Sequence, residues 1–344
     1  MKEEIIKAFS FFYIVLVFYL SLLASYVEAF VILESFSGIY LLGGVDHPVS
    51  NKLIAMPDIK GSSIRARWKN IEPSEGKYNW SYLDTEIKKA KAHKKSVTLR
   101  ILTGVWSPDW LYKKGTSQFV FMDRNPLHKR TYGKSLRMPI PWDESYLKAW
   151  EVFIMAMGNR FGKDPAVVMV HLSGPTCLTA EMNLPHKKDN LSQWERTGYS
   201  PEKLIYAWQR SIDVFAQAFP NKPIVLNLAR RAIYDDRVIK EVISYGSKKY
   251  GQRFLIQMNA LMADKDQDTR RPDIGWVRDY ADKGGWVGFQ LRRGNRLKGP
   301  LLDAMERGLV RGARYFEVYQ REVSMYPDVL SLINKRLDEL MVSP

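Results

Sequence analysis

Residues 312–320 read Gly-Ala-Arg-Tyr-Phe-Glu-Val-Tyr-Gln and lie near the end of a chain of 344 residues. Side chains alternate between the two faces of a β-strand, so Phe316 and Val318 share one face, and Tyr315, Glu317 and Tyr319 share the other. The first face suits packing under helices. The second holds a carboxylate between two tyrosines, which is costly inside a domain unless the carboxylate is paired or used in chemistry. The stretch therefore predicts a strand with an ion-paired or functional face.

Seven further strand-like segments precede this one and alternate with helical stretches. They are 38–43, 62–68, 96–102, 167–172, 223–228, 254–259 and 285–291, and a helix over 330–340 closes the chain. Eight βα units in sequence predict an α/β fold, a single (β/α)8 TIM barrel over residues 30–344. The alternative, a doubly wound sheet, lacks the glycine-rich phosphate loop expected after its first strand.

The same alternation predicts an unusually polar barrel interior, where packing alone would favour Val, Ile and Leu. The inward set comprises Arg65, Arg67, Arg100, His171, Asn227, Gln257, Asn259, Gln290 and Glu317. Even-numbered strands contribute to shared layers, so one layer is expected to combine Glu317 with His171, with Gln257 or Asn259, and with Arg65 or Arg67. A structural alternative stays open, in which Arg100 or Arg67 only neutralises Glu317 and His171 is an ordinary core residue.

The composition bounds the partners and cofactors. Hydrophobic residues make up 46% of the chain, enough for a large core, and the formal net charge is +15. Membranes, nucleic acids and anionic polysaccharides all suit a basic surface, but no zinc-finger or aromatic RNA-binding motif is present, so no nucleic acid partner is predicted. Cys177 is the single cysteine, which excludes an intrachain disulfide, and we expect an ordinary loop residue. Neither metal-ligand spacing nor a nucleotide-binding loop is present, so no metal or cofactor is predicted.

The N-terminus predicts export. Residues 8–24 form an uncharged apolar run after Lys2 and Lys7, and Val27-Glu28-Ala29 offers small residues where a signal peptidase cleaves. The run is also nearly long enough to span a bilayer. Residues 1–29 are therefore interpreted as a signal peptide or an uncleaved membrane anchor. The remainder is expected to be secreted or extracytoplasmic, with membrane contact only through this segment.

One stretch of the chain carries a family pattern. Residues 64–84 read IRARWKNIEPSEGKYNWSYLD, and Pro108-Asp109-Trp110-Leu111 follows the third strand. The first segment resembles the second βα unit of retaining glycoside hydrolase barrels, the β-galactosidase-like families, and the second is similar to their Pro-x-Trp-Leu turn. The resemblance covers residues 38–185, and the rest of the chain shares the topology. In the Ile-Glu-Pro segment, Glu72 begins a βα turn, where we expect it to be structural.

The resemblance implies a carbohydrate substrate and two carboxylates, an acid/base after strand four and a nucleophile near the end of strand seven. The sequence departs from both positions, because Ser173-Gly174-Pro175-Thr176 replaces the usual Asn-Glu and the second candidate lies on strand eight. We assign Glu317 as the nucleophile and Glu181, beside apolar Leu178, Ala180 and Met182, as the acid/base. Residues predicted to bind sugar or to orient Glu317 are Arg67, Arg100, His171, Asn227, Asn259, Gln290, Tyr315 and Tyr319, with Trp110, Trp142 and Trp286 as stacking platforms.

Three functions follow from these residues. The first is a secreted glycoside hydrolase that cleaves O-glycosidic bonds of an oligosaccharide or polysaccharide, with an acidic polysaccharide as the first substrate class to test because of the positive charge. The second is a barrel that binds glycans without cleaving them, since the Asn-Glu pair is missing. The third is a basic exported protein that adheres to anionic cell-surface polymers, with an affinity that would collapse as salt rises.

Overall fold

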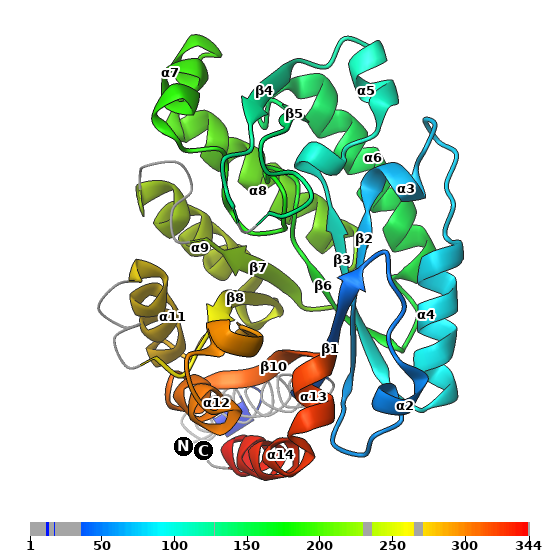
Figure 1. The fold of residues 1–344 in the computed structure, drawn as a ribbon, viewed down its shortest axis with the longest axis vertical. Coiled ribbons are helices and arrows are strands. Elements are labelled where there is room, and N and C mark those ends of the chain that lie inside the picture. Colours follow the sequence, from blue (N-terminus) through cyan, green and yellow to red (C-terminus); the bar gives the residue numbers. More distant parts are fainter. Residues whose placement is uncertain are drawn as a thin grey trace, which may run out of the picture.

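Eight parallel strands close into a barrel in the computed structural model (Figure 1). The strands are β1 (Gly38–Val45), β2 (Gly61–Arg67), β3 (Ser96–Leu102), β6 (Val167–His171), β7 (Ile224–Leu228), β8 (Phe254–Leu261), β9 (Val287–Leu291) and β10 (Ala313–Tyr319). Each pairs with its neighbour in chain order, and β10 pairs with β1 to complete the ring. The predicted (β/α)8 fold is confirmed, and the strand that carries Glu317 is the eighth of the barrel.

The structure describes residues 12, 13, 17, 36–126, 128–229, 236–264 and 271–342. The leader predicted over 1–29 lies outside these residues apart from Phe12, Tyr13 and Val17, so its interpretation stays a prediction. Arg230, Arg231 and Arg270, which belong to basic pairs of the sequence, also lie outside them. Within the described ranges, no helix is long and apolar enough to cross a membrane.

Helices surround the barrel in the order expected of βα units (Figure 1). The longer ones are α4 (Ser81–Ala92), α6 (Glu144–Phe161), α8 (Pro201–Ala218), α9 (Asp236–Tyr250), α11 (Pro272–Asp282), α12 (Leu301–Val310) and α14 (Pro327–Val342). Local sequence sets their starts: the side chains of Asp143 and Ser200 accept hydrogen bonds from the first turns of α6 and α8, and Pro201 takes the first helical position of α8.

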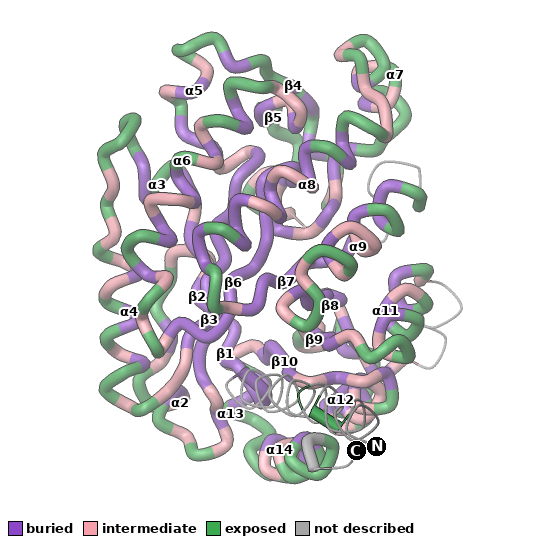
Figure 2. The backbone as a smooth tube through the Cα atoms, turned by 180° about the vertical axis from the view of Figure 1, so that it is seen from behind, coloured by how far each residue is buried: buried purple, intermediate pink, exposed green. Residues whose placement is uncertain are grey.

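Shorter elements occupy the connections. They are α2 (Asn51–Ile54), α3 (Trp68–Ile71), η1 (Gly104–Trp106), α5 (Asp109–Lys113), α7 (Lys188–Arg196), η2 (Gly251–Arg253), η3 (Gly294–Leu297) and α13 (Gln320–Met325). The long connection after β3 also folds into an antiparallel hairpin, β4 (Gln118–Met122) with β5 (Ser135–Pro139), which the sequence did not predict. In both overall views α5, the hairpin and α7 lie at the same end of the molecule (Figures 1 and 2).

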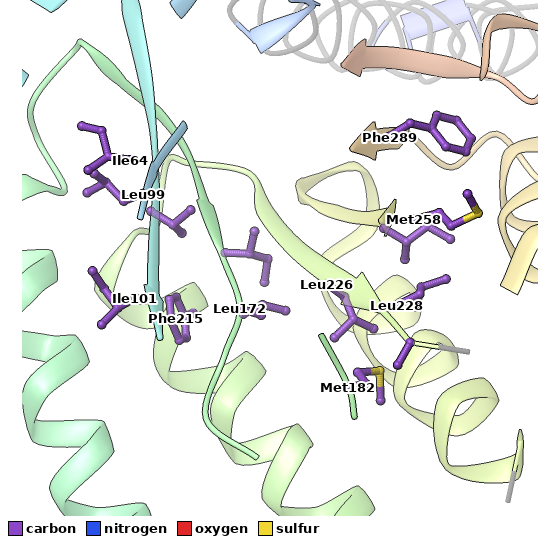
Figure 3. Close-up of a cluster of buried hydrophobic side chains, with 14 of the residues drawn as sticks. Ile64, Leu99, Ile101, Leu172, Met182, Phe215, Leu226, Leu228, Met258 and Phe289 are labelled. Carbon is purple, nitrogen blue, oxygen red and sulfur yellow. The ribbon is translucent and has the colours of Figure 1, made fainter. Parts of the chain in front are cut away.

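The outward faces of the strands form one continuous apolar layer with the helices. Figure 2 shows the barrel strands as the most buried part of the chain, and Figure 3 shows members of the layer, including Leu99, Leu226, Met258 and Phe289 from four strands. Phe215 reaches this layer from α8. Burial of aliphatic and aromatic side chains on this scale is the main source of the stability of the barrel.

The inward faces are layered along the barrel axis. A second apolar cluster combines Phe36, Tyr40, Val168, Met169, Val225, Leu255, Trp286 and Tyr315, and these residues stand at or near the start of their strands. They fill the N-terminal end of the barrel, whereas the polar inward residues come later in the strands. The polar side chains of the interior thus lie towards the C-terminal end of the barrel, where barrels of this fold hold their active sites.

Glu72, in the turn after β2, is buried and hydrogen-bonded within the turn, as expected of a structural residue. Its carboxylate is 2% exposed and accepts hydrogen bonds from the indole of Trp68 at 2.7 Å and the backbone N–H of Gly76 at 2.8 Å. Burial raises the pKa of Glu72 against the effect of these two donors. Cys177, expected to be an ordinary loop residue, is a buried free thiol whose pKa burial raises.

Candidate active site

The carboxylate of Glu317 lies at the centre of a buried polar layer. Arg100 donates to its two oxygens at 2.7 and 2.8 Å, Ser63 donates to Oε1 at 2.5 Å, and Gln257 donates to Oε2 at 2.9 Å. Nε2 of His171 lies 3.5 Å from Oε1. Glu317 has 0% exposure and Arg100 has 3%. Strands two, four, six and eight thus share a layer around Glu317, and Arg100 joins it from β3.

Arg100 lowers the pKa values of both Glu317 and His171 in this layer. Burial alone would raise the pKa of Glu317, but the charge of Arg100, the proximity of His171 and the donated hydrogen bonds bring it to about 2. Burial and Arg100 lower the pKa of His171 to about 3, against the opposing effects of Glu317 and Asn227. At neutral pH the layer therefore holds one ionised carboxylate, one guanidinium and a neutral imidazole.

A chain of hydrogen bonds leads from this layer to Glu181. The Nε2 atom of Gln257, 2.9 Å from Glu317, also donates to Oδ1 of Asn259 at 2.6 Å. Asn259 in turn donates from Nδ2 to Oε1 of Glu181 at 2.8 Å, and Asn183 donates to the other oxygen at 3.0 Å. Glu181 is only partly buried. The two predicted carboxylates thus belong to one network, one member buried and the other reaching the surface.

A cleft of about 1060 Å³ opens above the layer, at the C-terminal ends of the strands. Its lining includes Arg65, Arg100, Gln290, Tyr319, Glu181 and Asn259 from the barrel and the loop after β6. Asp123, Arg124, Asn125 and His128 from the connection between β4 and β5 also line it, as do Arg271, Arg292, Arg293 and Arg296 from the loops after β8 and β9. The cleft has the location and the size of a ligand-binding site in this fold.

The cleft brings together five of the predicted site residues and leaves four below it. Glu181, Arg100, Asn259, Gln290 and Tyr319 line the cleft. Glu317, His171, Asn227 and Tyr315 are fully buried, and Tyr315 donates to Oε1 of Gln257 at 2.6 Å from the apolar end of the barrel. The prediction that Tyr315 binds sugar is corrected, because its hydroxyl is used inside the protein.

Two predicted residues, Arg67 and Trp110, have partners outside the cleft. Arg67 pairs with Asp46 at 2.5 Å and lies over the ring of Trp106, with its guanidinium carbon 4.4 Å from the ring centroid. The indole of Trp110 donates to the carbonyl of Glu72 at 3.1 Å and packs on Trp68. Neither Arg67 nor Trp110 lines the cleft. The expectation that these two residues contact a glycan there is therefore corrected.

Two further tryptophans were expected to stack on sugar rings, and the structure corrects both expectations. Trp142 packs against Trp194 and Tyr199, at 5.6 Å between ring centroids in both cases. Trp286 is 7% exposed and packs against Phe36 at 5.4 Å, at the opposite end of the barrel. Both rings are part of the packing of the protein and do not line the cleft.

The sequence did not assign a role to the arginines after β8 and β9. Arg271 is the N-cap residue of α11, and Arg292 and Arg293 directly follow β9. Their basic pairs were visible in the sequence, but only the adjacency of β8 and β9 in the barrel brings them to one side of the cleft. In the part of the chain that the structure describes, no group of three His, Cys, Asp or Glu residues is arranged to hold a metal ion.

Comparisons with known proteins agree with this architecture. Residues 54–219, just under half of the chain, match the family model described as β-galactosidase, glycoside hydrolase family 42. A search of curated proteins finds no match.

Solved glycosidase structures share the barrel. A β-galactosidase from the psychrophilic Marinomonas ef1 superposes with a TM-score of 0.60 at 12% identity, over 89% of this chain and 62% of its own. The β-amylase catalytic domain from Paenibacillus polymyxa has a TM-score of 0.61 at 12% identity, over 89% of this chain and 99% of its own. A β-galactosidase from Halorubrum lacusprofundi has a TM-score of 0.55 at 13% identity, over 82% of this chain and 52% of its own.

The chain spans between half and two thirds of the length of the two β-galactosidases, and at these identities the superpositions establish the fold alone. The family match adds sequence evidence over the second to fourth βα units. Together they show a resemblance to glycoside hydrolases and specify no substrate. The chain is a (β/α)8 barrel that resembles the β-galactosidase-like glycoside hydrolases in both sequence and architecture.

Proposed function

We propose that the protein hydrolyses O-glycosidic bonds of an oligosaccharide or polysaccharide bound in the cleft. The observation that carries the proposal is the hydrogen-bonded connection from Glu181, in the cleft, through Asn259 and Gln257 to Glu317. Glycosidic cleavage requires two carboxyl groups, one that protonates the leaving oxygen and another that acts as nucleophile or base. This network offers two carboxyl groups at the end of the barrel where enzymes of this fold hold their catalytic residues.

Glu181 is the proposed acid/base, because it is the member of the pair that lines the cleft. The amides of Asn259 and Asn183 each hold one of its oxygens, which fixes the plane of the carboxyl group. A proton donor must lie within hydrogen-bond reach of the leaving oxygen, and a fixed carboxyl plane makes that contact reproducible. Arg100, Gln290 and Tyr319 would contact sugar hydroxyls on the floor of the cleft.

Glu317 is the proposed second carboxylate, and its use requires a movement. In the structure it has no exposed surface and is covered by Arg100, which also contacts Gln290 at 3.2 Å. A nucleophile must touch the anomeric carbon of the sugar, so Arg100 would have to exchange its bond with Glu317 for one with the substrate. The low pKa of Glu317 favours the ionised form that a nucleophile needs.

A specific observation supports a second function, that of a barrel that binds glycans without cleaving them. The turn after β6 holds Ser173, Gly174 and Pro175 where related barrels carry Asn-Glu, and the Gly174 carbonyl accepts hydrogen bonds from Thr103 and Tyr146. This turn therefore presents packed backbone. With Glu317 buried, Glu181 would be the single member of the pair open to a ligand, which suffices for binding and not for hydrolysis.

Replacement of Glu181 by Gln distinguishes the two functions. The full chain and the variant are incubated with a panel of neutral and acidic polysaccharides, and the release of reducing ends is measured beside binding to the same glycans. Hydrolysis predicts release by the wild type and a loss of at least a hundredfold in the variant. Asp338→Asn, an exposed substitution on α14, is the control and should change neither readout. Binding without release by the wild type favours the second function.

We also propose that residues 1–29 direct export, so that the barrel over 30–344 works outside the cytoplasm. The apolar run 8–24 and the small residues before position 30 support this proposal. Sequencing the N-terminus of the protein isolated from its host tests it. A mature chain that begins at Phe30 would support a cleaved signal peptide, and a full-length chain in the membrane fraction would support an anchor. A full-length chain in the cytoplasm would contradict both.

A further inference from the structure

One wall of the cleft carries arginines that the proposed reaction does not use. Arg292 and Arg293 follow β9, Arg296 lies in η3 and Arg271 directly precedes α11, and all four line the cleft. Among the described residues that line it, nine are Lys or Arg and three are Asp or Glu. A cleft with this balance has a strongly positive potential, which its low-dielectric walls concentrate.

Arg292 is the member of this group with a buried donor that lacks an acceptor. Its Nε atom is buried and has no hydrogen-bond partner among the described residues. Burial, followed by repulsion from Arg271 and Arg296, lowers its pKa, against the opposing effects of Glu181 and Tyr319. An arginine stays charged in proteins, so this arrangement leaves a desolvated donor beside two like charges. A bound anion would satisfy the donor and relieve the repulsion.

Two described carboxylates near Arg292, those of Glu181 and Asp273, have hydrogen-bond donors of their own. Both oxygens of Glu181 accept hydrogen bonds from the amides of Asn183 and Asn259. Asp273, which is fully buried, pairs with the guanidinium of Arg271. Arg271 is also fixed to the carbonyl of Asn259 at 3.2 Å. Arg271 is therefore fixed by its own neighbours, whereas Arg292 beside it forms no ion pair with a described carboxylate.

The backbone around Arg292 is fixed from three sides. The N–H of Arg292 donates to the carbonyl of Leu261 at 2.8 Å, and the N–H of Ala263 donates to the carbonyl of Leu297 at 2.8 Å. The N–H of Gly294 donates at 2.8 Å to Glu322, which is 3% exposed. The loop that carries Arg292, Arg293 and Arg296 is thus attached to β8 and α13, so the guanidinium needs little ordering when it binds.

We propose that Arg292, flanked by Arg271 and Arg296, binds an oxyanion substituent of the glycan, a carboxylate or a sulfate ester, beside Glu181. The guanidinium fork matches the geometry of either oxyanion, and both carry the charge that the wall lacks. The identification of the ligand as a glycan rests on the function proposed above. The anion site itself rests on the unpartnered Nε atom of Arg292 and the charge of the cleft.

Two measurements on the full chain test the site, each with Arg292→Gln beside Lys283→Gln as control. Lys283 is exposed between α11 and β9, at the opposite end of the barrel, so both variants lose one positive charge and only one loses it in the cleft. The first measures binding of trigalacturonate, its methyl ester and a sulfated galactotriose by calorimetry. The second measures the rise in melting temperature on replacing sodium chloride by sodium sulfate at equal ionic strength.

We expect at least one anionic trisaccharide to bind about tenfold more tightly than the neutral ester, and Arg292→Gln to remove that advantage. Arg292→Gln should bind the neutral ester as tightly as the wild type does. Lys283→Gln should bind all three trisaccharides as the wild type does. Sulfate also raises the melting temperature of proteins by exclusion from their surface, and Lys283→Gln should keep the full rise whereas Arg292→Gln loses the part due to binding. Arg292→Lys, which keeps the charge and loses the fork, should be intermediate.

Equal affinity for the neutral ester and for both anionic trisaccharides, or equal behaviour of the two variants in both measurements, would overturn the site. Failure of all three trisaccharides to bind, with the same sulfate response in both variants, would overturn it as well. The results that would contradict the proposed hydrolysis differ from those that would contradict the anion site. Cleavage of a neutral glycan without discrimination of anions removes only the anion site, whereas binding of anions through Arg292 without cleavage removes only the hydrolysis.

Discussion

Arg100 donates to both carboxylate oxygens of Glu317, at 2.7 and 2.8 Å, inside a barrel where neither residue is more than 3% exposed. The pair joins strands three and eight, and it separates an apolar end of the barrel from the open cleft. Two charges buried together in this way are compensated by each other and by the hydrogen bonds of Ser63 and Gln257. The removal of one partner should therefore cost far more than the removal of both.

The first prediction concerns this asymmetry. Arg100→Met should lower the free energy of unfolding by about 3–5 kcal/mol, because the charge of Glu317 is left buried without its counter-ion. The double variant Arg100→Met with Glu317→Leu should recover much of that loss. Urea denaturation of the full chain measures both. Arg160→Met breaks the exposed pair with Asp84 and should cost about 1 kcal/mol or less. Equal losses for the exposed and buried pairs would contradict this account of the barrel interior.

The second prediction is an acid-induced loss of stability that depends on Glu317. Its pKa of about 2 in the folded chain lies below the value of about 4.3 for an exposed glutamate, so the ionised form stabilises the fold. The contribution is complete above pH 4.3 and is lost as the pH falls towards 2. Urea unfolding between pH 2 and 5 should show a larger decline for the wild type than for Glu317→Gln. Parallel curves would mean that Glu317 titrates normally.

The third prediction concerns His171 in a different range of pH. Its pKa of about 3 lies below the ordinary value of about 6.5, so the unfolded chain binds a proton that the folded chain excludes. The stability due to the neutral imidazole is therefore complete above pH 6.5 and declines as the pH falls towards 3. The free energy of unfolding of His171→Gln should therefore vary less between pH 6.5 and 4 than that of the wild type, and equal pH dependence of the two chains would contradict this prediction.

The fourth prediction concerns the apolar layer between strands and helices. Leu226→Ala should lower the free energy of unfolding by about 2–5 kcal/mol, because Leu226 has 0% exposure within the cluster of Figure 3. Leu332→Ala, at 38% exposure on α14, should cost less than about 1 kcal/mol. Chemical denaturation measures both. A small loss at Leu226 would indicate that the layer closes over the cavity or is less tightly packed.

The fold was predictable because its signals are local. Alternation within each segment separated Phe316 and Val318 from Tyr315, Glu317 and Tyr319, and the structure places the first two in the outer apolar layer and the others inside or at the cleft. A period of two is a property of the single strand, so it needs no knowledge of neighbours. The same signal predicted all eight barrel strands within a few residues.

The site was less predictable, because depth and adjacency are properties of the closed barrel. The layer of Glu317 contains His171 and Gln257 as expected, but Ser63 takes the place expected for Arg65 or Arg67. The prediction gave the inward face of β2 correctly but placed the wrong residue of that face in the layer of Glu317. Two residues along a strand move a side chain by one layer. Tyr315 and Trp286 likewise face inward, but at the closed end.

The hairpin after β3 and the arginine wall come from connections, where no periodicity applies. Asp123 and His128 reach the cleft because the β4–β5 hairpin lies at the same end as the strand termini. Arg271 and Arg292 come together only because β8 and β9 are neighbours. Such contacts follow from the order of strands in the barrel, which the sequence predicts, and from the course of each loop, which it does not.

The central claim, that Glu181 and Glu317 act as a pair, is tested most directly by turnover of Glu317→Gln. Release of reducing ends from the best glycan of the panel is measured for the wild type, Glu317→Gln and Ser63→Ala, with melting temperatures to verify folding. Ser63→Ala removes one donor and keeps the carboxylate. The account predicts at least a hundredfold loss in folded Glu317→Gln and a modest change in Ser63→Ala. Wild-type turnover by a folded Glu317→Gln would contradict it, and would make the Arg100–Glu317 pair structural.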